Sequence, residues 1–417
     1  MPGSNGSNDS TNARKLENPM NPSQIPSMPG ADAGSSDLDV ERAVRERYGA
    51  AAKQREAALC CPIDYDPRYL EAIPEAVLER DYGCGDPSRY VRPGDTVLDL
   101  GSGGGKICFI ASQIAGAEGR VLGVDVNEEM LALARSAAPE VAAATGLHNV
   151  EFLTGHIQDL ALPLEKLDAW LGVHPVRGHA DLAALESEQA RLRREQPLVP
   201  DASVDLVVSN CVLNLVRSED RANLVREIFR VLRPGGRIAL SDIVSDEVVP
   251  EDLRNDPVLW SGCVSGAFQE QELLEALAAA GFQGMTLDVF SEETFQVVRG
   301  IEFRSVTVTA IRGDDGPCLE GNQAVIYRGP FSEVRDDDGH VLRRGERTAV
   351  CARTFEQLSA APYAEHFIPI APRLEVPESR RAVYDCARTA VRHPRETKGE
   401  SYSETTEGGS CGPGECC

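Results

Sequence analysis

Short apolar runs alternate with helical patterns through the middle of the chain, and this alternation restricts the fold more than any other feature. The runs are TVLDL, VLGVDV, VEFLTGHI, VDLVVSN and RIALSDIV. In most of the segments between them, apolar residues recur at every third or fourth position, as in an amphipathic helix. Because strands that alternate with helices form a parallel sheet covered on both faces, we predict an α/β fold with a doubly wound, Rossmann-like sheet over about residues 93–244.

The first part of the chain divides by composition. Residues 1–36 are rich in Ser, Asn, Pro and Gly, and we expect them to form a disordered leader. The first ordered domain then covers residues 37–245. Within it, residues 165–203 are too long for an ordinary connection in such a sheet, so they predict a partly helical surface insertion.

The second part of the chain changes character twice. Residues 246–298 predict a mainly helical region next to the sheet. Residues 299–375 contain strand-like pieces, including SVTVTAI and QAVIYRG, and predict a small β-rich C-terminal domain. Residues 376–417 finish in a stretch rich in Gly, Ser, Thr and Glu that ends in SCGPGECC, so we expect a mostly disordered tail that contains cysteine.

Charge and cysteine content limit the classes of function. The chain has 42 Lys and Arg residues against 66 Asp and Glu residues, a formal charge of -24 that repels phosphate backbones, so no nucleic-acid partner is expected. No run approaches the roughly 18 apolar residues of a membrane helix, and no signal-peptide pattern is present, so we expect a cytoplasmic monomer that is not bound to membranes. The 12 cysteines should then be reduced and available as core thiols, ligands or nucleophiles.

A glycine-rich turn follows the first predicted strand, in DLGSGGGK. Asp99, Gly101, Ser102 and Gly103 lie at this strand-to-helix turn, where glycines let the backbone approach a ligand. An isolated turn of this kind often only packs a helix against a strand. The order of an acidic residue before the glycines is the form found in methyltransferases, whereas a dehydrogenase usually has G-x-G-x-x-G after an apolar strand end.

Two later segments sharpen the prediction of a nucleoside ligand. Asp125 ends the second strand about twenty residues on, where a carboxylate can accept hydrogen bonds from ribose hydroxyls, and Val126 follows it in the predicted site. His156 and Ile157 follow the third strand, where backbone groups and an apolar side chain can frame an adenine. Met130 can line the same pocket or belong to the core. Together these residues favour S-adenosylmethionine over a dinucleotide as the cofactor.

Three cysteines fall where the predicted topology places a ligand crevice. Cys211 directly follows the fourth strand, next to Asn210, whose amide can orient the cofactor or the acceptor. Cys84 in YGCGDP and Cys263 in WSGCVSGA have small neighbours, which we interpret as room for a bulky ligand at the sulfur. Three thiols without a C-x-x-C pair suit a soft three-ligand centre better than four-coordinate zinc. Trivalent arsenic binds three sulfurs and keeps a lone pair that can attack a sulfonium methyl group, so we predict arsenic as the acceptor.

The motifs together resemble the arsenite methyltransferase family over about residues 60–369. They are YGCG, DLGSGGG, NEEMLALAR, SNCVLNLV, RVLRPGG and LWSGCVSGA. The resemblance implies that Cys84, Cys211 and Cys263 bind trivalent arsenic, with residues 246–298 as part of the arsenic-binding region. The positions that match the family's cofactor site are Tyr82, Asp99, Gly101, Asp125, Met130, Ile157 and Asn210. It also implies methylation of arsenite and methylarsenite for detoxification, with thioredoxin or glutathione as the reductant.

The resemblance also assigns a role to an adjacent pair of cysteines. Cys60 and Cys61 correspond to an upstream cysteine that, in the family, forms a disulfide with the equivalent of Cys84 during turnover. Which member of the pair acts stays open. The insertion and the absence of a cysteine in NQAVIYRG, where some relatives have one, are departures from the family.

Two functions other than arsenic methylation are compatible with parts of this sequence. One is a methyltransferase acting on a carbon or oxygen of a small organic acceptor, with structural cysteines. The other is a thiol-rich arsenic- or zinc-binding protein with a non-catalytic nucleotide fold, against which the intact Asp99 and Asp125 argue. Cys108 is expected to be structural, while Cys318, Cys351 and Cys386 lie outside the predicted crevice and receive no role.

Overall fold

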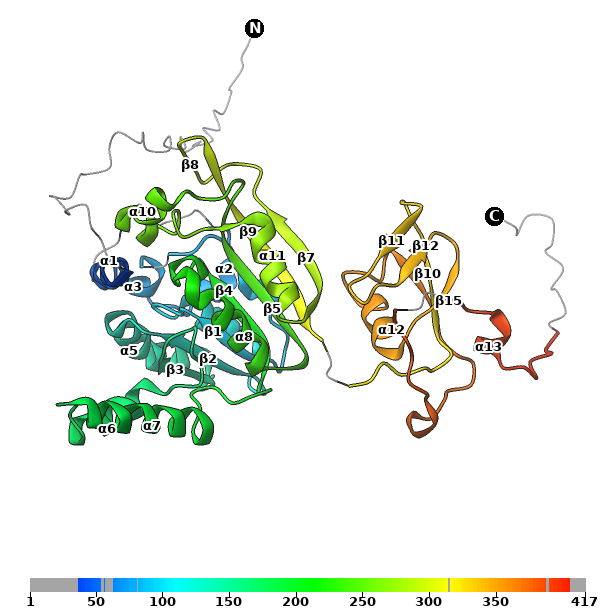
Figure 1. Cartoon of the computed structure of the whole chain (residues 1–417), viewed down its shortest axis with the longest axis horizontal. Coiled ribbons are helices and arrows are strands. Elements are labelled where there is room, and N and C mark those ends of the chain that lie inside the picture. Colours follow the sequence, from blue (N-terminus) through cyan, green and yellow to red (C-terminus); the bar gives the residue numbers. More distant parts are fainter. Residues whose placement is uncertain are drawn as a thin grey trace, which may run out of the picture.

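The computed structural model describes residues 37–53, 56, 63–80, 82–313, 316–387 and 390–405. Figure 1 shows two bodies, a larger one built on the main sheet and a smaller C-terminal domain. The predictions for residues 1–36, for Cys60 and Cys61, and for the end of the tail lie outside the described residues. None of the helices in the described ranges is long and apolar enough to span a bilayer.

The predicted parallel sheet is present. Its strands are β1 (Thr96–Leu100), β2 (Arg120–Asp125), β3 (Val150–Thr154), β4 (Val204–Asn210) and β5 (Leu232–Ser245). They lie in the order β3-β2-β1-β4-β5, and all neighbouring pairs are parallel. Every residue of β4 is buried, as expected of a central strand covered by helices on both faces. The doubly wound sheet is therefore confirmed.

Helices cover both faces of this sheet (Figure 1). The main ones are α4 (Lys106–Ala115), α5 (Glu128–Thr145), α8 (Arg221–Val231) and α11 (Glu270–Ala279). Side chains alternate along β1, so that Val97 packs with α4 and α5 while Leu98 packs with α8 and α11 on the other face. The Asn127 side chain caps α5 by accepting a hydrogen bond from the Met130 N–H at 3.0 Å, which fixes where the helix begins beside β2.

Two antiparallel strands extend the sheet, and they correct the predicted domain boundary. β9 (Ile301–Arg312) pairs antiparallel with β5, and β7 (Phe282–Phe290) pairs with β9. The prediction that residues 299–312 belong to the C-terminal domain is therefore wrong, as is the helical prediction for β7. The short strands β6 (Phe268–Gln269) and β8 (Gln296–Val298) complete this edge. The alternating apolar side chains of β9 indicate a strand, but nothing local in them indicates its partner.

The N-terminal helices and the helices after β5 lie over the carboxyl edge of the parallel strands. They are α1 (Asp37–Ala51), α3 (Glu75–Leu78), α9 (Glu251–Arg254) and α10 (Pro257–Ser261). The short helix α2 (Pro67–Leu70) instead packs against α4, whose Gln113 side chain donates a hydrogen bond to the Tyr69 carbonyl at 2.8 Å. Arg47 of α1 donates hydrogen bonds to the Val258 carbonyl at 3.1 Å and to the Ser261 hydroxyl at 3.0 Å. These contacts join α1 to α10. Short 3-10 helices span Pro87–Tyr90, Leu213–Leu215, Ser218–Asp220 and Glu378–Arg380.

The insertion consists of two helices beside β3, as Figure 1 shows. α6 (Leu164–Val173) and α7 (His179–Glu195) pack on each other through Leu167 and Leu192. His174 stacks on Trp170 with ring centroids 4.4 Å apart. Two helices thus occupy most of residues 165–203, and the interpretation of this segment as an insertion stays a prediction.

The C-terminal domain is a small antiparallel β structure. Its four-stranded sheet contains β14 (Phe367–Ile370), β10 (Ala324–Tyr327), β13 (Arg347–Ala349) and β15 (Ala390–Val391), in that order. A hairpin of β11 (Glu333–Arg335) and β12 (Val341–Arg343), together with α12 (Ala352–Leu358), covers a core around Val325 and Val350. β15 and α13 (Pro394–Lys398) fall in the predicted disordered tail, so that prediction is wrong for the described residues up to 405.

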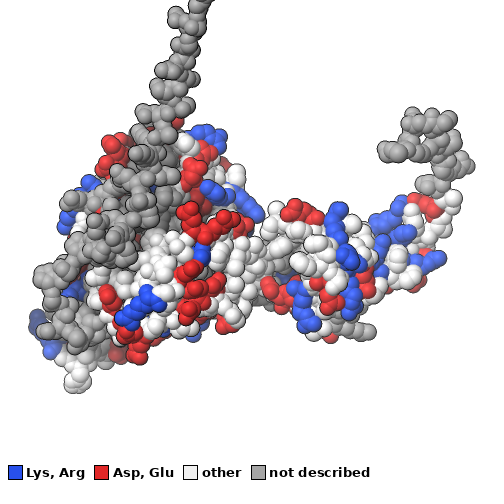
Figure 2. All heavy atoms as spheres, turned by 90° about the horizontal axis from the view of Figure 1, so that it is seen from above, with Lys and Arg blue, Asp and Glu red and all other residues white. Residues whose placement is uncertain are grey.

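Charged side chains of both signs cover the face shown in Figure 2. The figure shows acidic side chains on both bodies, interspersed with basic ones. On this face the acidic side chains are thus distributed over both bodies rather than gathered at one place.

Candidate functional site

A cavity of about 190 Å³ lies at the carboxyl ends of β1, β2 and β4. In open α/β sheets this edge is where ligands bind. All of the predicted cofactor-site residues line it: Tyr82, Asp99, Gly101, Ser102, Gly103, Asp125, Val126, Met130, His156, Ile157 and Asn210. We call this space the cofactor cavity. The structure thus brings together residues that the sequence placed on five separate segments.

The glycine turn forms one wall of the cofactor cavity. Gly101 and Gly103 have φ angles of 67° and 50°, in the left-handed region that favours glycine. A Cβ atom on Gly101 would lie 2.5 Å from the Val212 side chain, so this glycine also allows the turn to approach the residue after Cys211. The cofactor wall and the loop that carries Cys211 are therefore in direct contact.

Asp125 lies next to the glycine turn and is held by backbone donors. One carboxylate oxygen accepts a hydrogen bond from the Gly103 N–H and the other from the Asn127 N–H, both at 2.8 Å. Burial raises the pKa of Asp125 above its ordinary value, and these donors oppose that rise. Ser102 has a buried hydroxyl for which the described residues provide no hydrogen-bond partner. A polar ligand group in the cavity would satisfy it.

Helix α1 adds a wall that sequence reasoning missed. Arg45 and Tyr48 line the cofactor cavity, together with Arg80 and Arg217 from later segments. The Tyr48 hydroxyl lies 3.7 Å from the Cys263 sulfur, and its ring packs edge-on against Tyr82. The sequence of this helix contains no motif that would place it over the site.

The three predicted arsenic-binding cysteines lie together in a buried group next to the cofactor cavity. Cys84, Cys211 and Cys263 are all at most 7% exposed and belong to one apolar cluster. We call them the crevice cysteines. Cys84 and Cys211 are joined by a disulfide with a Cα–Cα distance of 5.8 Å, and the Cys263 thiol donates a hydrogen bond to the Cys211 carbonyl at 3.0 Å. Arsenic can bind to all three sulfurs only after this disulfide is reduced.

The loop that carries Cys84 is fixed by Asn210. The Asn210 side-chain carbonyl accepts hydrogen bonds from the Cys84 N–H at 2.8 Å and the Gly85 N–H at 3.1 Å. A Cβ on Gly83 would collide with Asn210, and one on Gly85 would lie 2.5 Å from the Ser241 hydroxyl. The flanking glycines thus allow the loop to pack closely on the sheet. Our interpretation of them as room for a ligand is wrong, and Asn210 orients the Cys84 segment.

Two crevice cysteines have a backbone conformation that is rare outside glycine. Cys211 has a φ angle of 60° and Cys263 one of 61°. The Cys211 N–H donates to the Ser241 carbonyl at 2.8 Å, and the Asn214 amide donates to the Cys263 carbonyl at 3.2 Å. Non-glycine residues in this region are found mainly at functional sites, where the surrounding structure compensates for the strain.

Asp242 is an acidic group at the crevice that sequence reasoning missed. One of its oxygens and the sulfurs of Cys84 and Cys211 all lie within 4.8 Å of one another. Its carboxylate accepts hydrogen bonds from the Leu213 N–H at 2.9 Å and the Ile243 N–H at 2.8 Å, and burial raises its pKa to about 7. Its place in the carboxyl-terminal part of β5 is the signal that could have identified it.

The structure also tests the expectation for Cys108. This residue is fully buried in α4, and its thiol donates to the Asp99 carboxylate at 3.3 Å. It points into the helix–sheet packing, away from the crevice cysteines, and does not line the cofactor cavity.

Comparison with known families separates the chain into two parts. Residues 92–174 and 177–281 match a family described as a methyltransferase domain. Residues 314–402 match a family described as a domain of unknown function. The second match begins just after β9, in agreement with the corrected boundary.

Individual relatives cover most of the chain. The arsenite methyltransferase of Aquipseudomonas alcaligenes is 30% identical over 348 residues, which are 79% of this chain and 90% of the relative. The arsenite methyltransferase of Mus musculus is 28% identical over 92% of this chain and 98% of its own length. The crystal structure of an arsenic (III) S-adenosylmethionine methyltransferase from Chlamydomonas reinhardtii is 27% identical, with a TM-score of 0.51, over 76% of this chain and 99% of that one.

Proposed function

This chain belongs to the arsenite methyltransferase family, and we propose that its crevice cysteines hold trivalent arsenic for methylation by S-adenosylmethionine. The observation that carries the proposal is the convergence of Cys84, Cys211 and Cys263 beside the cofactor cavity. Three sulfurs match the ligand number of trivalent arsenic, and soft sulfur ligands suit it. Arsenite and methylarsenite are the proposed acceptors.

The residues of the cofactor cavity fit S-adenosylmethionine. The Asp125 carboxylate lies where ribose hydroxyls would donate to it, and the orphan Ser102 hydroxyl lines the same space. Met130 and Ile157 supply apolar surface for an adenine ring. When bound, S-adenosylmethionine supplies an electrophilic methyl group on a sulfonium centre.

The crevice cysteines would act by binding and positioning. Each As–S bond forms as a thiol proton leaves with an arsenite hydroxide as water, so three thiols and As(OH)₃ give a tris-thiolate and three waters. Arsenic carries no proton in this state, so no general base is required for its lone pair to attack. The fixed Cys84 loop and the buried Cys211 and Cys263 hold the arsenic in one place, which lowers the entropic part of the barrier.

The oxidation state of arsenic must be restored after each transfer. The methylated centre is formally pentavalent, and two thiolates that leave it as a disulfide return two electrons to it. The bond between Cys84 and Cys211 supports this pair as one source of these electrons, and Cys60 or Cys61 with Cys84 is the alternative implied by the family. We propose that the protein is a monomer in the cytoplasm and that thioredoxin or glutathione reduces the disulfide there.

Arsenic speciation after reaction tests the proposed site. The purified chain is incubated with arsenite, S-adenosylmethionine and a thiol reductant, and methylated arsenic is measured by chromatography. We expect methylated products from the parent and none when Cys263 is replaced in Cys263→Ser, while the matched variant Cys318→Ser keeps parental activity. Parental turnover by Cys263→Ser would exclude Cys263 as a required ligand.

A further inference from the structure

The C-terminal domain contains a second group of three thiols that the proposed function does not use. The sulfurs of Cys318, Cys351 and Cys386 all lie within 4.8 Å of one another. All three are free thiols, whereas two of the crevice cysteines form a disulfide. We call them the C-terminal thiol cluster. In this structure the cluster therefore contains three thiols close together, whereas the crevice contains one thiol, Cys263, and one disulfide.

Three separate segments build the C-terminal thiol cluster. Cys318 and Cys386 flank an antiparallel bridge between Leu319 and Val383, and the Cys318 carbonyl accepts a hydrogen bond from the Tyr384 N–H at 2.7 Å. Cys351 is the N-cap of α12. Cys351 is completely buried, while Cys318 and Cys386 are half-buried. The cluster therefore combines one buried cysteine with two that are partly exposed.

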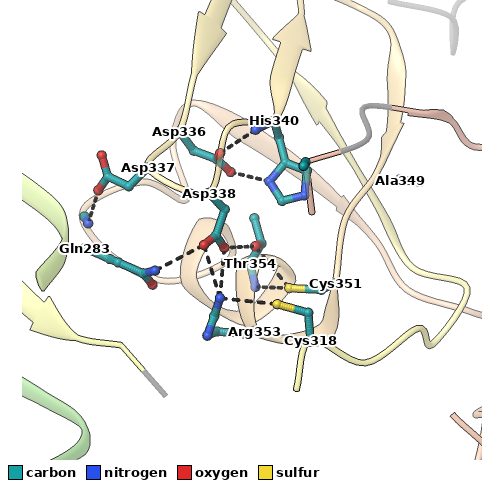
Figure 3. A network of polar contacts seen from close by, with 12 residues as sticks. Gln283, Cys318, Asp336, Asp337, Asp338, His340, Ala349, Cys351, Arg353 and Thr354 are labelled. Carbon is teal, nitrogen blue, oxygen red and sulfur yellow. Dashed lines mark hydrogen bonds and ion pairs between the residues drawn. The ribbon is translucent and has the colours of Figure 1, made fainter. Parts of the chain in front are cut away.

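Polar contacts hold two of these sulfurs in place, as Figure 3 shows. The Cys351 sulfur accepts a hydrogen bond from the Thr354 N–H at 3.4 Å, and the Arg353 guanidinium donates to the Cys318 sulfur at 3.3 Å. Arg353 is itself paired with Asp338 at 3.1 Å. The Arg353 guanidinium fixes the direction of the Cys318 sulfur and opposes the rise in the pKa of this thiol, but burial outweighs it and the pKa of Cys318 stays above its ordinary value.

The same network reaches the main sheet. Asp338 accepts a hydrogen bond from the Gln283 amide of β7 at 3.1 Å, and the neighbouring Asp337 accepts one from the Gly284 N–H at 2.6 Å (Figure 3). Asp338 also accepts from the Thr354 hydroxyl at 3.1 Å. The Asp338 oxygens thus accept hydrogen bonds from Gln283, Arg353 and Thr354. Asp338 does not lie within 4.8 Å of all three cluster sulfurs. The cluster presents three sulfurs without a fourth protein ligand among the described residues.

We propose that the C-terminal thiol cluster is a second binding site for inorganic trivalent arsenic, separate from the site of methylation. Arsenite would bind as a tris-thiolate, with three As–S bonds formed, three waters released and no change in the oxidation state of arsenic. Structural zinc requires four ligands and is the poorer match. Methylarsenite has only two exchangeable groups and leaves one thiol unused, so the cluster should bind arsenite in preference to the methylated product.

The binding test uses the full chain without S-adenosylmethionine. In the background variant, Ser replaces every cysteine except Cys108 and the cluster, namely Cys60, Cys61, Cys84, Cys211, Cys263, Cys411, Cys416 and Cys417. Equilibrium dialysis against arsenite should then show about one arsenic per chain, and X-ray absorption should show about three As–S bonds. Adding Cys351→Ser should remove this binding, whereas adding Cys108→Ser should not. Binding that is unchanged by Cys351→Ser, or no binding in the background variant, overturns the proposal.

A second measurement applies to the unmodified chain and does not depend on the folding of variants. Alkylation of Cys318 and Cys386 by iodoacetamide is followed by mass spectrometry with and without arsenite. We expect arsenite to protect both residues and methylarsenite or zinc at equal concentration to protect them less. Equal alkylation with and without arsenite, or stronger protection by zinc, contradicts the proposal.

A methylation assay separates this proposal from the proposed function. The variant Cys318→Ser/Cys386→Ser lacks two of the three ligands of the C-terminal thiol cluster and should keep parental turnover at saturating arsenite. Loss of turnover at saturating arsenite would show that the cluster belongs to the methylation site, and it would overturn the claim of a separate site. Parental turnover by Cys263→Ser would instead contradict the proposed methylation site and leave the proposal for the cluster unaffected.

Discussion

The two groups of three cysteines in this chain share a ligand set but differ in their surroundings. The crevice cysteines are buried among apolar side chains at the carboxyl edge of the main sheet, beside the cofactor cavity. The C-terminal thiol cluster lies in a polar network of the smaller domain, with Cys318 and Cys386 half-buried, and its cysteines do not line the cofactor cavity. Sulfur ligands alone therefore account for binding. Methyl transfer also requires a donor held in line with the bound arsenic.

The backbone holds the two groups in different ways. Two crevice cysteines are in the left-handed region, and the third is in a loop fixed by Asn210. In the cluster, a short bridge and a helix N-terminus bring the sulfurs together. The crevice is thus part of the cooperative core of the sheet, while the cluster depends on the fold of the smaller domain.

The proposed difference between the two groups would be lost if a crevice cysteine were not required for methyl transfer. We expect Cys211→Ser to lower kcat/KM for arsenite and for methylarsenite by about three orders of magnitude, roughly 4 kcal/mol, because a hydroxyl is too hard to replace a thiolate. Cofactor affinity should stay close to that of the parent in a titration. Cys351→Ser serves as the matched change in the cluster and should retain the parental kcat, measured at saturating arsenite.

A second prediction concerns the two electrons that reduce arsenic after methyl transfer in the crevice. Binding of arsenite by the cluster needs no such electrons. Either Cys60→Ser or Cys61→Ser should be tolerated, because adjacent thiols can exchange. The double change should block conversion of arsenite but spare the first methylation of methylarsenite, which binds fewer thiols. Arsenic speciation with each acceptor checks this, and full activity of the double variant on arsenite would remove the pair from turnover.

Cofactor affinity should depend on the main sheet alone. We expect Asp125→Ala to weaken S-adenosylmethionine binding by roughly 1–3 kcal/mol, because the ribose hydroxyls lose a buried acceptor. Calorimetric titration measures this change. Arsenite-dependent protection of Cys318 and Cys386 should be unaffected, and equal cofactor affinities of variant and parent would move the ribose contact elsewhere.

The smallest expected effect lies where the two domains meet. Asp338→Ala removes hydrogen bonds to Gln283, Arg353 and Thr354 and should lower the free energy of unfolding of the C-terminal domain by about 1 kcal/mol. Denaturant unfolding measures this change, and methylation by the crevice should persist. A variant as stable as the parent would show that water replaces these bonds fully.

Much of the main sheet and its cavity could be predicted because the signals are local. The functional residues lie close to the ends of short apolar runs: Asp99 is near the end of β1, Asp125 ends β2 and Cys211 directly follows β4. β7 and β9 carry no such signal, since the edge on which a strand pairs is decided by contacts far away in the sequence.

The C-terminal thiol cluster could not be predicted for the same reason. Cys318, Cys351 and Cys386 are too widely spaced to form a motif, and no one of them has neighbours that indicate a ligand site. Only the bridge between Leu319 and Val383 brings Cys318 and Cys386 together. The fold in this case supplies information that spacing does not contain.

The left-handed backbone at Cys211 and Cys263 creates a conflict between stability and function. Strain of this kind costs about 1–3 kcal/mol at each position, and glycine would relieve it. Glycine has no sulfur, however, and a residue chosen for the turn alone could not bind arsenic. The two positions are therefore ones at which engineering for thermal stability and engineering for activity should select different amino acids. A screen of this protein for heat resistance alone would be expected to enrich inactive variants there.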